Sequence, residues 1–536
     1  MLELSNIFRD DFIYLNFLDK WIVINATEIQ KYSFKNSLTN IPISSDSFAV
    51  FVIKDDDENI GIALLSGLTL KKINSGIWKK SINKYDGFSP LVTPKKLRYR
   101  PYKKGLFLKS ICSDSGFCLA FGQHSEKINN HFLGFLDFTY AKSPIKRIGD
   151  VSSNGFVYEI TYERSGYNAS SVLKSSFKKS SDNILFEYLV GEYINKQCLI
   201  FSCFVETYGV FYYKTHSDWE KMSSSTEIDK YTLIKSLEKV PVFEKTESLL
   251  AFACTKSKYL AILTQHIKKS KTLFEMIESE EFIENEILQV LYQIYMPLGI
   301  LAETFTHYDL HAKNVIIYEP VVGKYINYQY YENEEHDSYF ITFKSRYMAK
   351  IIDYGRSFFK DNSKHGITKS SSDIYDAVCC VKECDFIETD TERYGRMIKS
   401  RCGEKFGFYF ASPDPDAEKY ISSKHFISSS TCNISHDLRL LYDLKEIQDN
   451  YMLNMITERL TYRTEYGTPE IYEREGENDL NNIPIKINNV IDASSALEAV
   501  IYVSRDTNDK LYKDMESLGT LKIYRTGKPM EFIPAK

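Results

Sequence analysis

Three side chains, two of them five positions apart and the third later in the chain, could together carry out chemistry on a phosphate group. Asp309 supplies a carboxylate that can accept a proton, and Asn314 supplies an amide oxygen five positions later. Asp353 supplies a second carboxylate, two positions before Gly355. Amide and carboxylate oxygens are the ligands that a hard divalent cation prefers. Because positioning and charge neutralisation supply nearly all of the catalysis of phosphoryl transfer, this small set matches what that reaction needs.

A lysine and a glutamate upstream have the spacing of a phosphate-holding pair. Lys174 ends an apolar strand, and residues 183–196 carry apolar side chains with the period of an amphipathic helix. A lysine that holds phosphates must itself be held, and a carboxylate on a packed helix does this. Glu187 is the preferred partner because it is embedded in the apolar segment, and Glu192, about one turn later, is the alternative.

Two glycines flank a turn-rich segment ahead of that lysine. Gly149 and Gly155 lead into a strand that ends near Tyr162. A glycine-rich hairpin can lie over nucleotide phosphates because no bulky side chain blocks its backbone amides. An ordinary hairpin turn is the other interpretation of the same residues.

The segments ahead of the first carboxylate are predicted from their hydrophobic pattern. Residues 259–267 predict a buried strand that turns polar at its end, and residues 272–277 suit a short helix. Residues 282–305 predict a long apolar helix that leads to His307. Pro297 is expected to kink or interrupt that helix.

A long insertion separates Asn314 from Asp353. Strand-like sequence at 315–318 and 340–343 predicts an extended hairpin with an exposed tip. The predicted strand 347–352 then places Asp353 at its end.

Composition places the chain among ordinary globular proteins. It has 536 residues, 43% hydrophobic side chains and a net charge of −5, so two or three domains with a sizeable core are expected. Residues 1–20 lack the sustained apolar core of a signal peptide, and the apolar stretch 60–70 is too short to span a bilayer. These features predict a soluble protein of the cytoplasm.

The ten cysteines are expected to be free thiols in a reducing compartment. Cys379, Cys380 and Cys384 lie near Cys402, but no pair repeats with the short fixed gap of zinc sites. Small buried side chains are therefore the preferred interpretation, ahead of a metal site.

The first 141 residues carry no motif with a chemical role. Residues 47–53 and 60–65 predict two strands joined by an acidic turn. Residues 71–104 hold nine Lys and two Arg, with interleaved aromatic side chains, against one acid. Such a composition can hold nucleic acid through phosphate neutralisation and base stacking, while a solvated face or long loop is the preferred alternative.

The order of the motifs along the chain resembles that of the protein-kinase-like superfamily. It runs from the glycine-flanked turn through the strand lysine, the helix glutamate and the polar strand end to H-x-D-L-x-x-x-N and D-x-G. The resemblance covers residues 146 to at least 444. More narrowly, the Asp-Leu-His loop and residues 435–441, 466–470 and 487–490 resemble divergent serine/threonine protein kinases predicted for giant DNA viruses. The resemblance implies an α+β, bilobal protein-kinase-like fold. A β-rich N-lobe, a mainly helical C-lobe and an extra N-terminal β-containing region are expected.

The expected domains follow from these boundaries. They are an N-terminal region at 1–141, the N-lobe and hinge at 142–267, the C-lobe at 268–464, and a C-terminal extension at 465–536 that packs on the C-lobe. Within the extension, residues 491–502 predict a short helix and residues 515–534 predict strands.

The resemblance also implies a role for each motif residue. Asp309 would orient and deprotonate an acceptor hydroxyl, while Asn314 and Asp353 would hold magnesium. Lys174, paired with Glu187, would contact the α- and β-phosphates of ATP. The rest of the ATP site would comprise Gly149, Ser152, Gly155, Val157, Gln265 and Ile267.

Four further residues of the loop and of a later helix complete this comparison. His307 would brace the loop, and Asp437 resembles the buried aspartate that ties down the loop backbone. His311, also assigned to catalysis, stands where protein kinases place a lysine that contacts the γ-phosphate. A histidine at this position resembles the H-G-D-L-H-x-x-N loop of the aminoglycoside and choline kinase group. Tyr308 stands in place of the arginine that reads a phosphorylated activation loop, so control by such phosphorylation is not expected.

ATP- and magnesium-dependent transfer to Ser or Thr of a protein is the function that these residues predict. A pseudokinase that acts as a binding or virion-assembly module is one alternative, because the glycine spacing is wider than in G-x-G-x-x-G and no A-P-E follows Asp353. A small-molecule kinase is another, motivated by His311 and by the acidic stretch 465–479, which could line a pocket for a cationic substrate. For a viral chain, the host cytoplasm or the virion is the expected location, and no membrane partner is expected.

Overall fold

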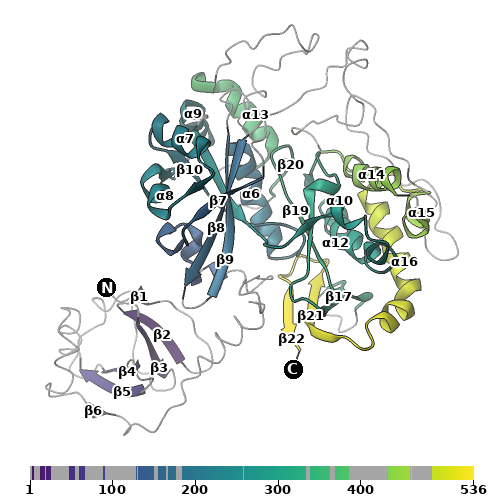
Figure 1. Ribbon diagram of the computed structural model, residues 1–536, viewed down its shortest axis with the longest axis horizontal. Coiled ribbons are helices and arrows are strands. Elements are labelled where there is room, and N and C mark those ends of the chain that lie inside the picture. The colour runs from purple at the N-terminus through teal and green to yellow at the C-terminus, as the bar shows by residue number, and fades with distance from the viewer. Residues whose placement is uncertain are drawn as a thin grey trace. The chain divides into compact units, whose positions relative to one another are not determined.

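Two compact units divide the chain, Met1–Phe107 and Leu108–Lys536 (Figure 1). The computed structural model describes six strands of the first unit and most of the second. In the second unit the described residues are 128–129, 131–149, 155–164, 167–176, 184–256, 259–333, 339–362, 369–384, 429, 432–448, 450–458, 460 and 486–535. Ser152, Cys402 and the acidic stretch 465–479 lie outside the described residues.

The first unit contains a six-stranded antiparallel sheet with its strands in sequential order. The strands are β1 Glu3–Leu4, β2 Phe12–Phe17, β3 Lys20–Asn25, β4 Phe48–Lys54, β5 Ile60–Ser66 and β6 Ser89–Pro90. The predicted strand pair is confirmed, since β4 and β5 form a hairpin in which Val50 is paired with Leu64. Apart from β6, the basic stretch 71–104 lies outside the described residues, so nucleic-acid binding stays a prediction.

The second unit begins with a seven-stranded antiparallel sheet in the order β11-β7-β8-β9-β13-β10-β12. Its strands are β7 Ile145–Ile148, β8 Gly155–Arg164, β9 Tyr167–Ser176, β10 Thr207–Tyr213, β11 Glu227–Ile228, β12 Leu237–Lys239 and β13 Leu260–Gln265. Alternate residues of β8 are buried, because successive side chains of a strand point to opposite faces. Three short helices flank the sheet, α7 His216–Ser224, α8 Lys230–Ser236 and α9 Thr246–Lys256 (Figure 1).

The helix predicted at 183–196 is confirmed as α6, Ile184–Cys198. It contacts β9, β10 and β13 of the sheet. Gly191 permits this close approach, because a Cβ at that position would lie 2.2 Å from Thr207 Oγ1 of β10. Tyr193 and Lys196 connect the far end of the helix to the following half of the chain, through hydrogen bonds to Thr304 Oγ1 and Asp361 Oδ2.

The apolar helix predicted at 282–305 is instead two helices, α11 Glu280–Asn285 and α12 Ile287–Ile300. The break lies at Glu286, whose buried carboxylate accepts hydrogen bonds from Ser345 Oγ and Arg346 Nε. Pro297 does not interrupt α12, which continues to Ile300. The expected interruption was therefore wrong, because a proline near the end of a helix removes one backbone hydrogen bond with only a single turn left to follow. The alternative expectation, a kink at Pro297, stays a prediction.

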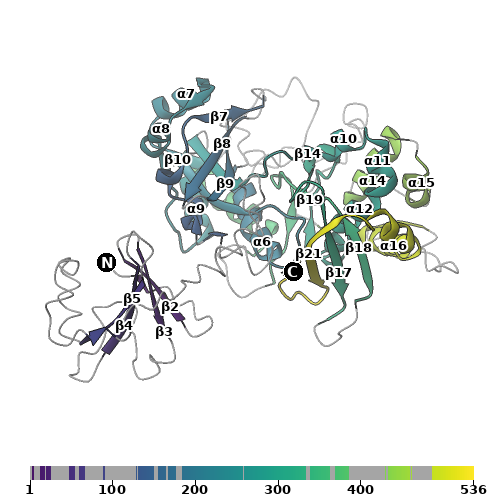
Figure 2. The same cartoon turned by 60° about the horizontal axis from the view of Figure 1, so that its bottom comes forward.

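The insertion and the C-terminal segment form one mixed sheet with the order β18-β17-β21-β22 (Figure 2). Its strands are β17 Lys324–Tyr331, β18 Ile341–Ser345, β21 Glu516–Tyr524 and β22 Glu531–Pro534. The predicted pairing of 315–318 with 340–343 was wrong, because β16 (315–318) pairs with β14 and β19, and the hairpin is formed by β17 and β18. The parallel pairing of β17 with β21 was not foreseen. The helix predicted at 491–502 is longer, since α16 spans Val490–Leu511 and packs against α12.

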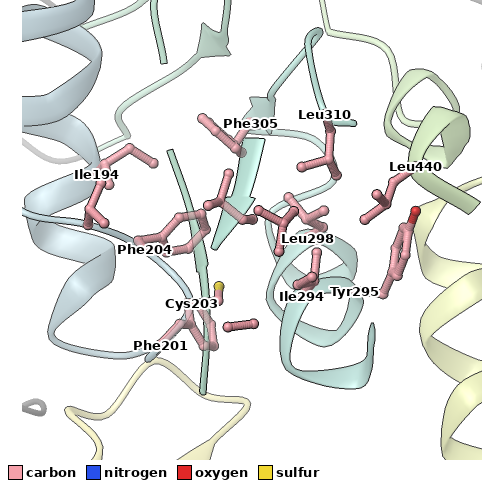
Figure 3. Packing of buried hydrophobic residues seen from close by; sticks show 14 of the residues in the cluster. Ile194, Phe201, Cys203, Phe204, Ile294, Tyr295, Leu298, Phe305, Leu310 and Leu440 are labelled. Carbon is pink, nitrogen blue, oxygen red and sulfur yellow. The ribbon is translucent and has the colours of Figure 1, made fainter. Parts of the chain in front are cut away.

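The second unit has further helices and strands. They are α10 Leu273–Met276, β14 Lys271–Thr272, β15 Phe305–Thr306, β16 Val315–Tyr318, β19 Met348–Ile351, β20 Phe358–Phe359, α13 Ser371–Cys380, α14 Arg439–Ile447 and α15 Tyr451–Thr457. Of these, β19 contacts α12 and α13 contacts α9. Figure 3 shows apolar side chains from α6, α12, α14 and the segments between them packed together, including Ile194, Leu298 and Leu440. This mixed helix and strand content is compatible with the expected two-lobed α+β fold.

Two further sequence expectations concern the cysteines and membrane-spanning segments. Cys198, Cys203 and Cys432 are free thiols as expected, but Cys254 is disulfide-bonded, so the expectation was wrong for that residue. Within the part of the chain that the structure describes, no helix has both the length and the apolar composition to cross a membrane.

Candidate active site

One lysine joins two carboxylates that come from different parts of the chain. Lys174 lies on β9, paired across the sheet with Val157 of β8 and with Ile262 of β13. Its Nζ donates to Glu187 Oε2 of α6 at 2.8 Å and to Asp353 Oδ1, just after β19, also at 2.8 Å. The alternative partner, Glu192, is exposed on the same helix.

The charges of these three groups depend on one another. Burial lowers the pKa of Lys174, but the carboxylates of Asp353 and Glu187 outweigh this effect and raise it overall. Lys174 lowers the pKa of Asp353 to about 2, against burial. Burial raises the pKa of Glu187, which is only 4% exposed, although Lys174 opposes the rise. Lys174 therefore stabilises both carboxylates as anions.

Asp353 is held in an uncommon backbone conformation. Its φ of 67° lies in the left-handed region, which costs a non-glycine residue of the order of 1–3 kcal/mol. The neighbouring Tyr354 is buried, and its hydroxyl donates to Ile351 O and accepts from Val205 N. Ile352 N donates to Asn314 O, which joins the start of β16 to the end of β19. These contacts place Asn314 and Asp353 at the same end of two paired strands.

Asp437 fixes the backbone of the loop that carries Asp309. Its two carboxylate oxygens accept hydrogen bonds from the backbone N–H groups of His307, at 2.7 Å, and Tyr308, at 3.0 Å. His307 Nε2 donates to Ile352 O, so Nδ1 can accept from Asp309 N. The carboxylate contacts match the backbone-anchoring role that the resemblance implied for Asp437. The imidazole contacts match the bracing role that it implied for His307.

Asp437→Ala is expected to lower the free energy of unfolding by about 2–6 kcal/mol, since two buried N–H groups would lose their acceptor at about 1–3 kcal/mol each. Urea unfolding monitored by circular dichroism measures this loss. Asp376→Ala, an exposed residue of α13, is the matched control and should change the value little. A loss below about 1 kcal/mol in Asp437→Ala would contradict the anchoring role.

The Asp309 carboxylate is surrounded by cationic side chains. Arg439 Nη1, at the start of α14, donates to Oδ1 at 3.1 Å. Arg356 Nη1 lies 3.7 Å from Oδ2, and His311 Nε2 lies 3.9 Å from Oδ1. Asn314 Nδ2 donates to the backbone carbonyl of Asp309 at 2.9 Å. Asn314 is therefore joined to the loop that carries Asp309.

Arg439 is the contact that sequence reasoning missed. It lies in the stretch 435–441 between the buried residues Leu438 and Leu440. An arginine inside such an apolar run is seldom buried unless it is paired, and this was the available signal. Its partner, however, lies 130 positions earlier in the chain.

His311 is not a permanent cation in this environment. Burial lowers its pKa, and Arg439 acts in the same direction, although the Asp309 carboxylate opposes them. Its Nδ1 accepts from Lys313 N, so the ring also caps the short helical turn Ala312–Asn314. A largely neutral imidazole near pH 7 can donate one hydrogen bond to a phosphate but brings no fixed charge.

Of the predicted glycine-rich turn, the structure describes only the two flanking glycines. Gly149 has a φ of 69°, and nothing lies within 4 Å of an added Cβ. Gly155 starts β8, and an added Cβ would lie 2.2 Å from Ser175 O of β9. The need for glycine at 155 therefore arises from the neighbouring strand.

Gly155→Ala should destabilise the protein near the upper end of about 1–3 kcal/mol, because the overlap is with backbone that cannot move without breaking the β8–β9 ladder. Gly149→Ala meets only the cost of a left-handed alanine, about 1 kcal/mol. Comparison of the two melting temperatures tests this order. A lower melting temperature for Gly149→Ala would contradict it.

The predicted hinge follows directly from β13. Gln265 N donates to Glu206 O, and His266 N donates to Ser170 O, so the chain is still held by the sheet at this point. Ile267 is buried, and among the described residues no partner is found for its backbone N–H. Gln265 Oε1 is also buried without a partner in that part of the chain. The Ile267 backbone N–H and Gln265 Oε1 could therefore form hydrogen bonds with a flat heterocyclic base at this position.

Asn314 and Asp353 are the two side chains at this site that could hold a divalent cation. Among the described residues there is no group of three His, Cys, Asp or Glu side chains that could hold a metal ion by itself. Asn314 and Asp353 instead offer an amide oxygen and a carboxylate from adjacent strand ends. Magnesium is commonly bound by one or two such side chains together with phosphate oxygens and water, so the pair fits this ion.

Comparison with known proteins gives a limited result. No family model matches the chain, and no curated protein matches it. Among solved structures, it is similar to a kinase domain from Plasmodium, with 14% sequence identity and a TM-score of 0.23. The match covers 42% of this chain and 55% of the kinase domain, so the chain spans about half the length of that structure. The kinase-like fold and the viral relationship both stay predictions.

Proposed function

We propose that the protein is an ATP- and magnesium-dependent phosphotransferase that acts on Ser or Thr hydroxyl groups of a protein. The observation that carries this proposal is the contact of Lys174 with both Glu187 and Asp353, at 2.8 Å each. A lysine held in this way can bind the α- and β-phosphates of a nucleotide while Asp353 remains ionised beside them. Asn314 and Asp353 would hold magnesium, which neutralises charge on the phosphates when bound.

The proposed reaction assigns the proton transfer to Asp309. The acceptor hydroxyl loses its proton to the Asp309 carboxylate as its oxygen forms a bond to the γ-phosphorus. The bond between the γ-phosphorus and the bridging oxygen breaks, and ADP leaves with that electron pair. Asp437 and His307 hold the loop in place during this step, since their contacts involve its backbone.

A phosphotransfer assay with γ-labelled ATP tests the proposal. The acceptors should include a casein-like protein, aminoglycosides and choline, and Asp353→Ala serves as the inactive control. Label on protein Ser or Thr with the wild type, and none with Asp353→Ala, is the expected result. Label on a small molecule would replace the protein acceptor. Absence of transfer, together with no thermal shift at millimolar ATP and magnesium, would leave a binding module instead.

A further inference from the structure

Arg439 is a buried cation whose position is hard to explain by stability alone. The residue is only 6% exposed, and a buried charge is unfavourable unless it is paired. Its Nη1 donates to Asp309 Oδ1 at 3.1 Å, whereas its Nε lies 3.7 Å from Asp443 Oδ2, too far for a hydrogen bond. Among the described residues, Nε has no hydrogen-bond partner. The side chain is therefore committed to Asp309.

The helix that carries Arg439 is rigidly placed. Leu438, Leu440 and Leu441 around it are all fully buried. Asp437, two residues earlier, holds the backbone of the loop at His307 and Tyr308, as described above. One short segment therefore fixes both the backbone of the loop, through Asp437, and the carboxylate of Asp309, through Arg439.

The two oxygens of the Asp309 carboxylate have different surroundings. The charged or titratable groups around it are Arg439 and Asp443 of α14, Arg356 after β19, and His307 and His311 of its own loop, with Asp353 beyond His311. Oδ1 accepts the hydrogen bond from Arg439. Oδ2 accepts none from a described residue, since Arg356 remains 3.7 Å away.

We propose that Arg439 is a positioning residue for Asp309, which holds Oδ1 and leaves Oδ2 to take the proton of the acceptor hydroxyl. This role rests on the proposed function. The fixed charge at hydrogen-bond distance comes from α14, since Arg356 remains 3.7 Å from the carboxylate.

Steady-state kinetics of Arg439 variants test this role. The kcat of Arg439→Met should fall about 10- to 100-fold, since a misplaced catalytic group is costly. KM for ATP should stay near the wild-type value, because Lys174 and Asp353 are untouched. Arg439→Lys keeps a charge but not the planar fork, and should lie between the two.

The matched control is Arg505→Met, since Arg505 is an exposed residue of α16 whose guanidinium lies near the Asp506 carboxylate and over the Tyr502 ring. Its kcat and its KM for ATP should equal those of the wild type. An inactive wild type would overturn the proposed function and, with it, the role of Arg439. An active wild type whose kcat is unchanged in Arg439→Met would overturn the role of Arg439 alone.

A second measurement does not depend on activity. Arg439→Met should lower the melting temperature less in an Asp309→Asn background than in the wild type, because the ionic partner is already absent. Equal losses in the two backgrounds would contradict the pairing. If Arg439→Met does not fold, Arg439→Lys in the same two backgrounds decides the question in the same way.

Discussion

Asp309→Asn is expected to lower kcat by about 10²–10⁴-fold, the contribution typical of a positioned general base. The amide keeps the shape of the side chain and can still accept from Arg439, but it cannot take a proton at neutral pH. Lys174, Glu187 and Asp353 are unchanged, so binding of ATP should be retained. The loss should therefore appear in kcat, with KM for ATP near the wild-type value.

Steady-state phosphotransfer measures the loss, and a thermal shift with ATP and magnesium measures nucleotide binding. Asp506→Asn is a suitable control, because Asp506 is an exposed residue of α16. A kcat of Asp309→Asn within a factor of ten of the wild type would remove Asp309 from the role of base. Loss of nucleotide binding as well would indicate a change of fold and not of chemistry.

Lys174→Met is expected to abolish detectable transfer and also to destabilise the protein at neutral pH. Without the lysine, Glu187 remains buried without its cation, and removal of one partner of a buried pair costs about 3–5 kcal/mol. Lys174→Met/Glu187→Gln should recover much of that stability but none of the activity. Lys174→Met/Glu192→Gln is the matched control, and it should recover nothing because Glu192 is exposed. Recovery by the Glu192 change instead would reverse the assignment of the partner.

The stability of the wild type and that of Lys174→Met should change with pH in opposite directions. In the wild type, the pKa of Asp353 is about 2, below its ordinary value of 3.8. The stabilisation is present above the ordinary value and is lost as the pH falls from about 4 to about 2. In Lys174→Met, burial raises the pKa of Glu187 with no cation to oppose it, so stability should increase as the pH falls through that raised pKa toward the ordinary value of 4.5. Melting temperatures between pH 3 and pH 8 test both signs.

Local patterns predicted the elements that carry the site. The apolar period of α6 was visible in the sequence, and Glu187 was preferred over Glu192 because it is embedded among apolar residues. The structure brings Glu187, and not Glu192, to Lys174. The strand before Asp353 was predicted in the same way, since apolar strands and amphipathic helices have short-range signals. Each of these inferences needed only neighbouring residues.

Contacts between distant segments could not be predicted in this way. Which side chain of α14 meets Asp309 depends on how that helix is rotated against a loop 130 positions earlier. The end of α16 was placed too early because its last turns, from Ser504 to Leu511, carry mostly polar residues that resemble a loop. The break at Glu286 arises where a carboxylate is buried by Ser345 and Arg346 from the hairpin, which no helical pattern can show.

The parallel pairing of β17 with β21 has a consequence for synthesis on the ribosome. β21 begins 185 residues after β17 ends. At about 5–20 residues per second, one edge of β17 would stay unpaired for roughly 10–40 seconds after its translation. An exposed strand edge can pair with other chains, so this interval is the period of greatest aggregation risk. Slower translation or a shortage of chaperones should therefore reduce the soluble yield of the protein.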